Sequence, residues 1–163
     1  MTTCCSLDDE RITLAGLFFE AHAGLVTELT RRLEAECGLS VSSFEVLLRL
    51  GRSEGQRLRM SDLAAQVSLS ASGLTRAIDR LEQQGFVARE SCPSDRRGSF
   101  ATLTPAGVKR IEEAASAHAG HVDALFTGLL DKRERAALEG ALRVVRDNLN
   151  PGALAGTKAQ PAS

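Results

Sequence analysis

The sequence lacks any uninterrupted apolar run that approaches about 18 residues, the length needed for a membrane-spanning helix. Its first ten residues, MTTCCSLDDE, also lack the basic and then apolar segments of a secretory signal peptide. We therefore expect a cytoplasmic protein with no membrane partner. At 163 residues, with 43% hydrophobic and 25% charged residues, the chain is long enough for one folded domain with a sizeable core.

Residues typical of catalytic and metal sites are also scarce. The four cysteines (Cys4, Cys5, Cys37 and Cys92) have no paired spacing typical of a zinc ribbon, so we expect reduced thiols. Only three histidines are present, none beside a cysteine and none in a glycine-rich phosphate loop. This composition offers no nucleophile with a partnered base and no metal triad. We predict that the protein is not an enzyme and that it needs no cofactor.

The net charge is only −1, but the charges are unevenly distributed. Residues 46–103 contain nine arginines, no lysine and six acidic residues, a balance of +3 that leaves −4 for the rest of the chain. A basic middle between acidic flanks indicates a DNA-facing surface on the central segment.

Residues 60–86 predict two short helices joined by a tight turn at Ser68 and Leu69. Ser61 and Ser70 stand where a hydroxyl can cap the free amides of each helix, and the second helix should stop at Gly85. The expected core positions, at helical spacing, are Leu63, Ala64, Val67, Leu74, Ile78 and Leu81. The outer face of the second helix then carries hydroxyls and guanidiniums suited to base edges and phosphates in a major groove: Ser70, Ser72, Thr75, Arg76 and Arg80. The alternative is an ordinary helical hairpin with a solvated polar face.

A strand-like pattern follows this helix-turn-helix. Residues 86–90 and 99–103 are short, partly alternating runs, which predict a β-hairpin with its tip at 91–98. Arg96 and Arg97 in the tip suit a neighbouring minor groove, where close phosphates favour an inserted arginine. Phosphates would repel Asp95, so we interpret this carboxylate as orienting the tip. The alternative for the arginine pair is a solvated turn.

The chain before the helix-turn-helix predicts two more helices. Residues 9–36 should form a long helix whose apolar side chains cover so wide an arc that it has two surfaces to pack against. A shorter helix should begin at Ser42 or Ser43 and stop near Gly51, followed by a short strand at 58–60.

Two helices are also expected after the hairpin. Thr104 and Pro105 are typical of a helix start, and this helix should reach about residue 129. Residues 131–134 read as a capping box for a final helix with a coiled-coil-like seam of Leu138, Leu142, Val145 and Leu149. We expect loose tails at 1–5 and 151–163. The predicted fold class is mainly α with a small β-wing, in one domain over residues 1–163.

This pattern resembles the multiple-antibiotic-resistance regulator (MarR) family of winged helix-turn-helix transcription factors. The resemblance is carried by LRMSDLAAQVSLSASGLTRAIDRLEQQGFVARE and by SDRRGSFATLTPAG, in which Asp95, Arg97 and Gly98 match the family's wing. It implies a homodimer with dimerisation helices at about 9–37 and 105–149 and a DNA-binding head at about 43–104. Two heads would grip successive major grooves of a pseudo-palindromic operator, usually as a repressor, with Arg97 in the minor groove. Gly73 offers no side chain where some relatives place a contact.

The resemblance also implies an effector, by default a small aromatic or phenolic molecule bound between the dimerisation helices and each head. The residues that could line this pocket, and that suit a core equally well, are Phe18, Phe19, His22, Phe44 and Leu48. Other members of the family sense zinc or peroxide, for which the candidates here are His22, His118 and His121, or Cys4 and Cys5. The absence of tryptophan disfavours the urate-responsive members. A helical adaptor that binds only protein is a further alternative, but it leaves the arginine wing without a role.

Overall fold

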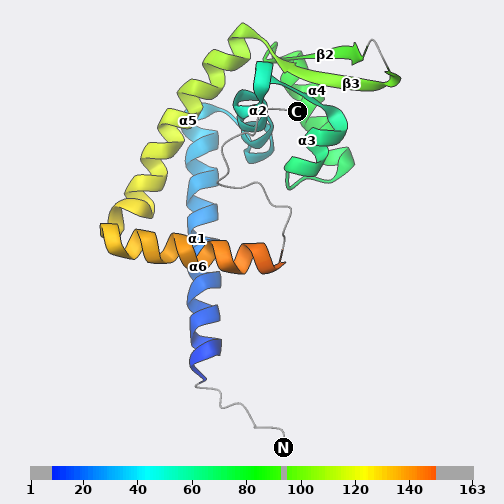
Figure 1. Ribbon diagram of the computed structural model, residues 1–163. Coiled ribbons are helices and arrows are strands. Elements are labelled where there is room, and N and C mark those ends of the chain that lie inside the picture. Colours follow the sequence, from blue (N-terminus) through cyan, green and yellow to red (C-terminus); the bar gives the residue numbers. More distant parts are fainter. Residues whose placement is uncertain (1–8, 93–94, 150–163) are drawn as a thin grey trace, which may run out of the picture.

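The structure is a computed structural model that describes residues 9–92 and 95–149. Within these ranges it describes all side chains except those of residues 92 and 95–98. It is mainly helical with one small sheet, as predicted. The helices are α1 (Glu10–Cys37), α2 (Val41–Arg52), α3 (Met60–Gln66), α4 (Ala71–Gln83), α5 (Pro105–Leu125) and α6 (Lys132–Leu149), with short 3-10 turns at Glu54–Gln56 and Thr127–Leu129. The strands are β1 (Arg57–Arg59), β2 (Val87–Cys92) and β3 (Asp95–Leu103). Figure 1 shows α2, α3, α4 and the sheet grouped at one end, with α1 and α5 extending away from this head.

Capping side chains set most of the helix starts. Asp9 accepts a hydrogen bond from the Arg11 amide at the start of α1, and Thr104 accepts one from the Gly107 amide at the start of α5. The predicted capping box is confirmed: Asp131 Oδ1 accepts from the Glu134 amide at 2.8 Å, and Glu134 Oε2 accepts from the Asp131 amide at 2.8 Å.

Two predicted helix starts are wrong. Helix α2 begins at Val41, because the Ser40 hydroxyl accepts from the Ser43 amide and so caps the helix earlier than Ser42 or Ser43 would. Helix α3 begins at Met60, directly after β1 ends, and Ser61 lies inside it with its hydroxyl bonded to Asp62 Oδ1. Strand β1 correspondingly covers Arg57–Arg59 instead of 58–60.

The core of the head lies where α2 meets α3, α4, α5 and the sheet. Its fully buried side chains include Leu47, Leu50, Leu63, Ile78, Leu81 and Val87. Ala64 is exposed, contrary to prediction, because the short α3 buries only Leu63 before the chain turns at Val67. Helix α2 ends at Arg52, one residue after Gly51 and so near the predicted stop.

Gly107 marks the tightest contact between α5 and the head. A Cβ at this position would stand 2.0 Å from the Phe86 carbonyl oxygen, so only glycine fits. A hydrogen bond joins the same two segments: the Thr104 hydroxyl, just before α5, donates to the Gly85 carbonyl oxygen at 2.6 Å. The start of α5 is therefore joined to the end of the helix-turn-helix.

The sheet is antiparallel in the order β1-β3-β2. Strands β2 and β3 form the predicted wing, but they continue through most of the segment expected to be loop, pairing Ser91 with Ser99 and Cys92 with Asp95. Polar residues in this stretch give no alternating pattern, so the ladder could not be read from hydrophobicity. Helix α5 is shorter than predicted and ends at Leu125, followed by a tight turn in which a Cβ on Gly128 would stand 2.6 Å from the Asp123 carbonyl oxygen.

Helix α1 is long and apolar enough, by length and composition, to cross a membrane, with a mean hydropathy of 1.2 over an 18-residue window. The sequence shows no uninterrupted apolar run here because polar residues, among them Glu20 and Glu28, divide the apolar stretches of α1. Core helices of soluble proteins pass the same test. None of this window is buried within one protomer, so α1 carries apolar surface that its own chain leaves uncovered.

Candidate nucleic-acid interface

Helix α4 is held by an apolar face and a tight N-terminal cap. The predicted core residues Leu74, Ile78 and Leu81 are buried, which fixes the rotation of the helix in the head. Ser70 Oγ accepts from the Gly73 amide at 3.1 Å, as predicted for a cap. A Cβ on Gly73 would stand 3.1 Å from that same oxygen, a tight contact that would require the Ser70 hydroxyl to shift by a few tenths of an ångström.

The opposite face of α4 carries the predicted DNA-contacting residues, and all five are exposed: Ser70, Ser72, Thr75, Arg76 and Arg80. Four of them, all but Arg76, already make contacts within the protomer. Ser72 Oγ lies 3.3 Å from Ser70 Oγ, and Thr75 Oγ1 donates to the Ala71 carbonyl at 3.0 Å. Arg76 has no hydrogen-bond or ion-pair partner in the part of the chain that the structure describes. Its guanidinium is therefore the group on this face best placed to bind an external acceptor.

Helix α2 and its N-cap residue Ser40 contact both ends of this interface. Glu45 Oε1 accepts from the Ser68 amide at 3.0 Å and so holds the turn between α3 and α4. Farther along α4, an Nη of Arg80 donates to Ser40 Oγ at 3.3 Å. Glu45 and Ser40 lie 23 and 40 residues from their partners, so no local sequence pattern reveals these two contacts.

The wing supplies a second basic element. Arg96 and Arg97 belong to β3 by backbone, as does Asp95, but their side chains lie outside the described part of the structure, so their roles stay predictions. Two other arginines of the basic segment are engaged with an aromatic ring: the guanidiniums of Arg57 and Arg59 lie 4.1 and 5.5 Å from the centroid of the Phe100 ring.

The five predicted pocket residues fall into two groups. Phe18, Phe19 and His22 are exposed on α1, where the Phe18 ring stacks on His22 with centroids 6.2 Å apart. Phe44 is buried in the head and Leu48 is half-buried against the same core. Among the described residues, the aromatic contacts of the first group stay within that group. The Phe44 ring instead contacts the His118 ring, with centroids 4.8 Å apart. The pocket therefore stays a prediction.

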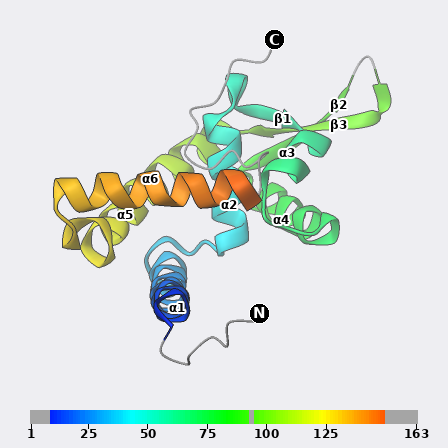
Figure 2. The ribbon, with the colours of Figure 1, turned by 60° about the horizontal axis from the view of Figure 1, so that its bottom comes forward.

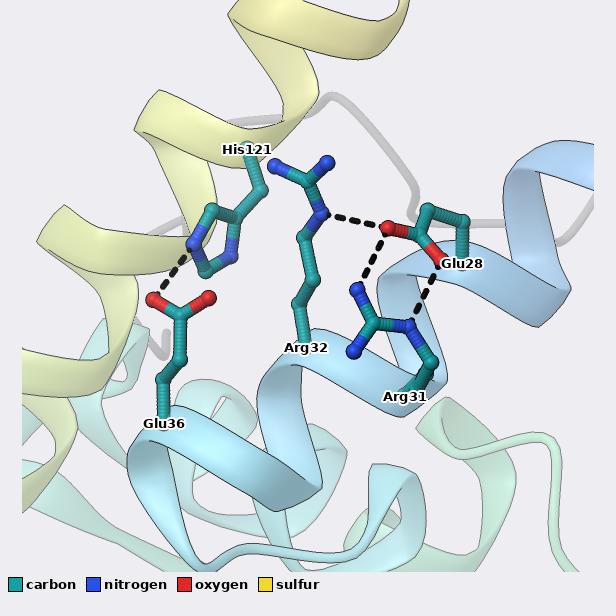
Figure 3. Close-up of polar contacts among 5 residues, drawn as sticks. All are labelled: Glu28, Arg31, Arg32, Glu36 and His121. Atoms are coloured by element: carbon teal, nitrogen blue, oxygen red, sulfur yellow. Dashed lines mark hydrogen bonds and ion pairs between the residues drawn. The ribbon is translucent and has the colours of Figure 1, made fainter.

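The junction between α1 and α5 is polar (Figure 3). His121 Nε2 lies 2.8 Å from Glu36 Oε2, a pairing across 85 residues of sequence that places a carboxylate beside one of the candidate residues of the zinc alternative. On the same stretch of α1, hydrogen bonds from Arg31 and Arg32 lower the pKa of the half-buried Glu28 to about 2.

Among the described residues, no group of three or more histidine, cysteine or acidic side chains could hold a metal ion, so the zinc hypothesis gains no support there. Cys4 and Cys5, the candidates for oxidant sensing, lie outside the described residues. Cys37 is a free cysteine buried at the end of α1.

Acidification is expected to destabilise the protein through His118. Burial, and to a smaller extent the neighbouring His121, lowers the pKa of His118 below its ordinary value of 6.5. The unfolded chain then binds this proton more readily than the folded one. The stability that this difference contributes is present in full above pH 6.5 and is lost as the pH falls below it.

Thermal unfolding between about pH 8 and pH 5 measures this effect. The Tm of the wild type should fall more steeply than the Tm of His118→Gln. His22→Gln, which alters an exposed imidazole on α1, is the matched control and should keep the wild-type slope. Equal slopes for the wild type and His118→Gln would contradict the assignment.

The predicted seam of α6 is largely uncovered in the protomer. Leu142, Val145 and Leu149 are 39%, 55% and 76% exposed, whereas Leu138 is half-buried. Figure 1 shows α6 and the N-terminal part of α1 apart from the head, and Figure 2 looks nearly along α1. Apolar stripes on two such helices need a further surface to cover them.

Comparisons with known proteins agree with this architecture. The sequence model of the MarR family matches residues 39–99. The chain is similar to AbsC, a MarR family transcriptional regulator from Streptomyces coelicolor, with 35% identity and a TM-score of 0.81 over 91% of this chain and 99% of AbsC. Sco3205 from the same organism, solved in complex with DNA, is 31% identical with a TM-score of 0.82 over 98% and 97% of the two chains. The transcriptional repressor MprA of Escherichia coli (strain K12) is 25% identical over 141 residues, which cover 86% of this chain and 79% of MprA.

Proposed function

The chain belongs to the MarR family of DNA-binding transcription regulators, which are not enzymes, and on that premise we propose that it acts as a homodimeric repressor. In this proposal residues 9–37 and 105–149 form the dimer interface and residues 43–104 form each DNA-binding head. The exposed apolar seam of α6 and the uncovered apolar surface of α1 support the interface. Two heads related by a two-fold axis would read a pseudo-palindrome with half-sites about 10 bp apart.

Helix α4 is proposed to enter the major groove. Ser70, Ser72, Thr75, Arg76 and Arg80 would contact base edges and phosphates, with Arg96 and Arg97 of the wing in the adjacent minor groove and Asp95 orienting them. The observation that carries this proposal is the outward guanidinium of Arg76, exposed on a helix whose opposite face is locked in the core. A planar guanidinium can bind a guanine edge or a phosphate through two hydrogen bonds.

Release from DNA is proposed to follow binding of a small aromatic or phenolic effector near Phe18, Phe19, His22, Phe44 and Leu48. Such a molecule would change the spacing of the two α4 helices, and a coupling of about 1 to 3 kcal/mol would suffice. Sensing of a metal through His22, His118 and His121, or of an oxidant through Cys4 and Cys5, is the alternative on the same fold. A protein acting on DNA in this way would work in the cytoplasm.

Binding to DNA from the protein's own upstream region should weaken steeply with salt. Each phosphate neutralised contributes about 0.9 to the slope of log K against log salt concentration, so two heads making about six phosphate contacts predict a slope near −5. A mobility-shift titration from low to high salt measures it, with a scrambled duplex of equal length as the control. A flat dependence would contradict electrostatic binding to a duplex.

A further inference from the structure

Arg89, at the base of the wing, reaches across to two carboxylates on α4. One Nη of its guanidinium bonds Glu82 Oε2 at 3.1 Å, and the other bonds Asp79 Oδ1. Glu82 Oε1 also accepts from the backbone amide of Arg89 at 3.3 Å. Three hydrogen bonds, two of them between charged side chains, therefore join one residue of β2 to one turn of α4.

These bonds lie at a point in the fold where a small change of angle would move the outer part of the wing. Strand β2 is an edge of the sheet, so its outward amides have no partner strand, and Glu82 satisfies one of them. The backbone link between α4 and β2 is only a short turn through Gly85, whose φ is +76°. Cys92, the last residue of β2, lies roughly 10 Å farther along the strand, so a small rotation at Arg89 moves the outer wing by more.

We propose that Arg89 is a positioning residue that fixes the wing relative to α4, so that both reach DNA in one geometry. This inference rests on the proposed function, in which α4 enters the major groove and the wing enters the adjacent minor groove. Arg89 itself contacts no DNA in this account. Its side chain is 33% exposed and its donors are directed at Asp79 and Glu82.

A different role for the same contacts is neutralisation of the two carboxylates, which would otherwise repel phosphates. Arg89→Lys separates the two roles, because lysine keeps the charge but cannot form the forked contact to two carboxylates. Positioning predicts weaker operator binding for this variant, whereas neutralisation predicts wild-type binding. Asp79→Asn combined with Glu82→Gln is the reciprocal variant: positioning predicts weaker binding, and neutralisation predicts binding that is unchanged or tighter.

The decisive experiment is a hydroxyl-radical footprint of the full chain on DNA from its own upstream region. Arg89→Gln should weaken binding about tenfold, within the range of measured couplings between contacting residues. It should also remove protection of the outer minor-groove flanks while the central major-groove protection persists at saturating protein. Arg52→Gln, which removes an equal charge from the exposed end of α2, is the matched control and should keep the flanks protected.

Several results would overturn the inference. They are flank protection retained in Arg89→Gln, protection lost equally at the centre and flanks, or wild-type binding by both Arg89→Lys and the carboxylate double variant. If Arg89→Gln does not fold, as judged by thermal unfolding, the lysine and double variants decide the question in the same footprint. A wild type that protects no DNA at all would instead refute the proposed function.

Discussion

Leu142→Glu is expected to split the dimer and abolish operator binding at concentrations where the wild type is saturated. In the protomer the Leu142 side chain is 39% exposed, so glutamate there costs little in the monomer. In the proposed dimer the same position lies within the apolar seam with Val145 and Leu149, where a carboxylate would be buried without a partner. A buried charge without a partner at an interface costs about 2–5 kcal/mol. Two-fold symmetry places one such charge in each protomer.

Sedimentation equilibrium measures the dimer directly, and a mobility shift measures its effect on DNA. Ala136→Glu adds the same charge to the opposite side of α6 and serves as the control, with expected wild-type dimerisation and binding. A Leu142→Glu protein that remains dimeric would remove this seam from the interface. A monomer that binds DNA as tightly as the wild type would contradict the need for two heads.

Local chemistry in the sequence was sufficient for most of the fold. Ser70, Thr104 and the Asp131 capping box begin helices where the pattern predicted, because a cap acts within three or four residues of itself. Ser61 was misread because β1 passes directly into α3, so the helix begins at Met60 with no side-chain cap. The exposed face of α4 could be predicted from its buried face, because the helical period determines which residues lie on each side of the helix.

Contacts between distant segments could not be predicted in this way. Glu45 reaches the amide of Ser68, Arg89 reaches Asp79, and His121 reaches Glu36 only after the helices have packed. Arg89 belongs to the basic central segment, yet its guanidinium is paired with Asp79 and Glu82 within the head. The local net charge therefore overstates the number of arginines that remain for an external partner, while the DNA-facing role of the segment stays a prediction.

Arg76→Ala is the second change with a large expected effect. Arg76 lies two residues after Leu74 and two before Ile78, both buried, so the packing of α4 directs its side chain outward and alanine should leave the fold intact. Loss of a two-bond contact to a base edge costs about 1–3 kcal/mol in each head. Binding to the specific duplex should therefore weaken more than binding to a scrambled one.

The central claim, that the exposed face of α4 reads DNA, is tested most directly by a mobility-shift titration of Arg76→Ala against the wild type on DNA from the protein's own upstream region. Lys109→Ala, which removes a charge from an exposed side chain of α5, is the control. We predict an affinity loss of at least about tenfold for Arg76→Ala, corresponding to about 1.4 kcal/mol, and none for Lys109→Ala. Wild-type affinity in a folded, dimeric Arg76→Ala protein would contradict the account.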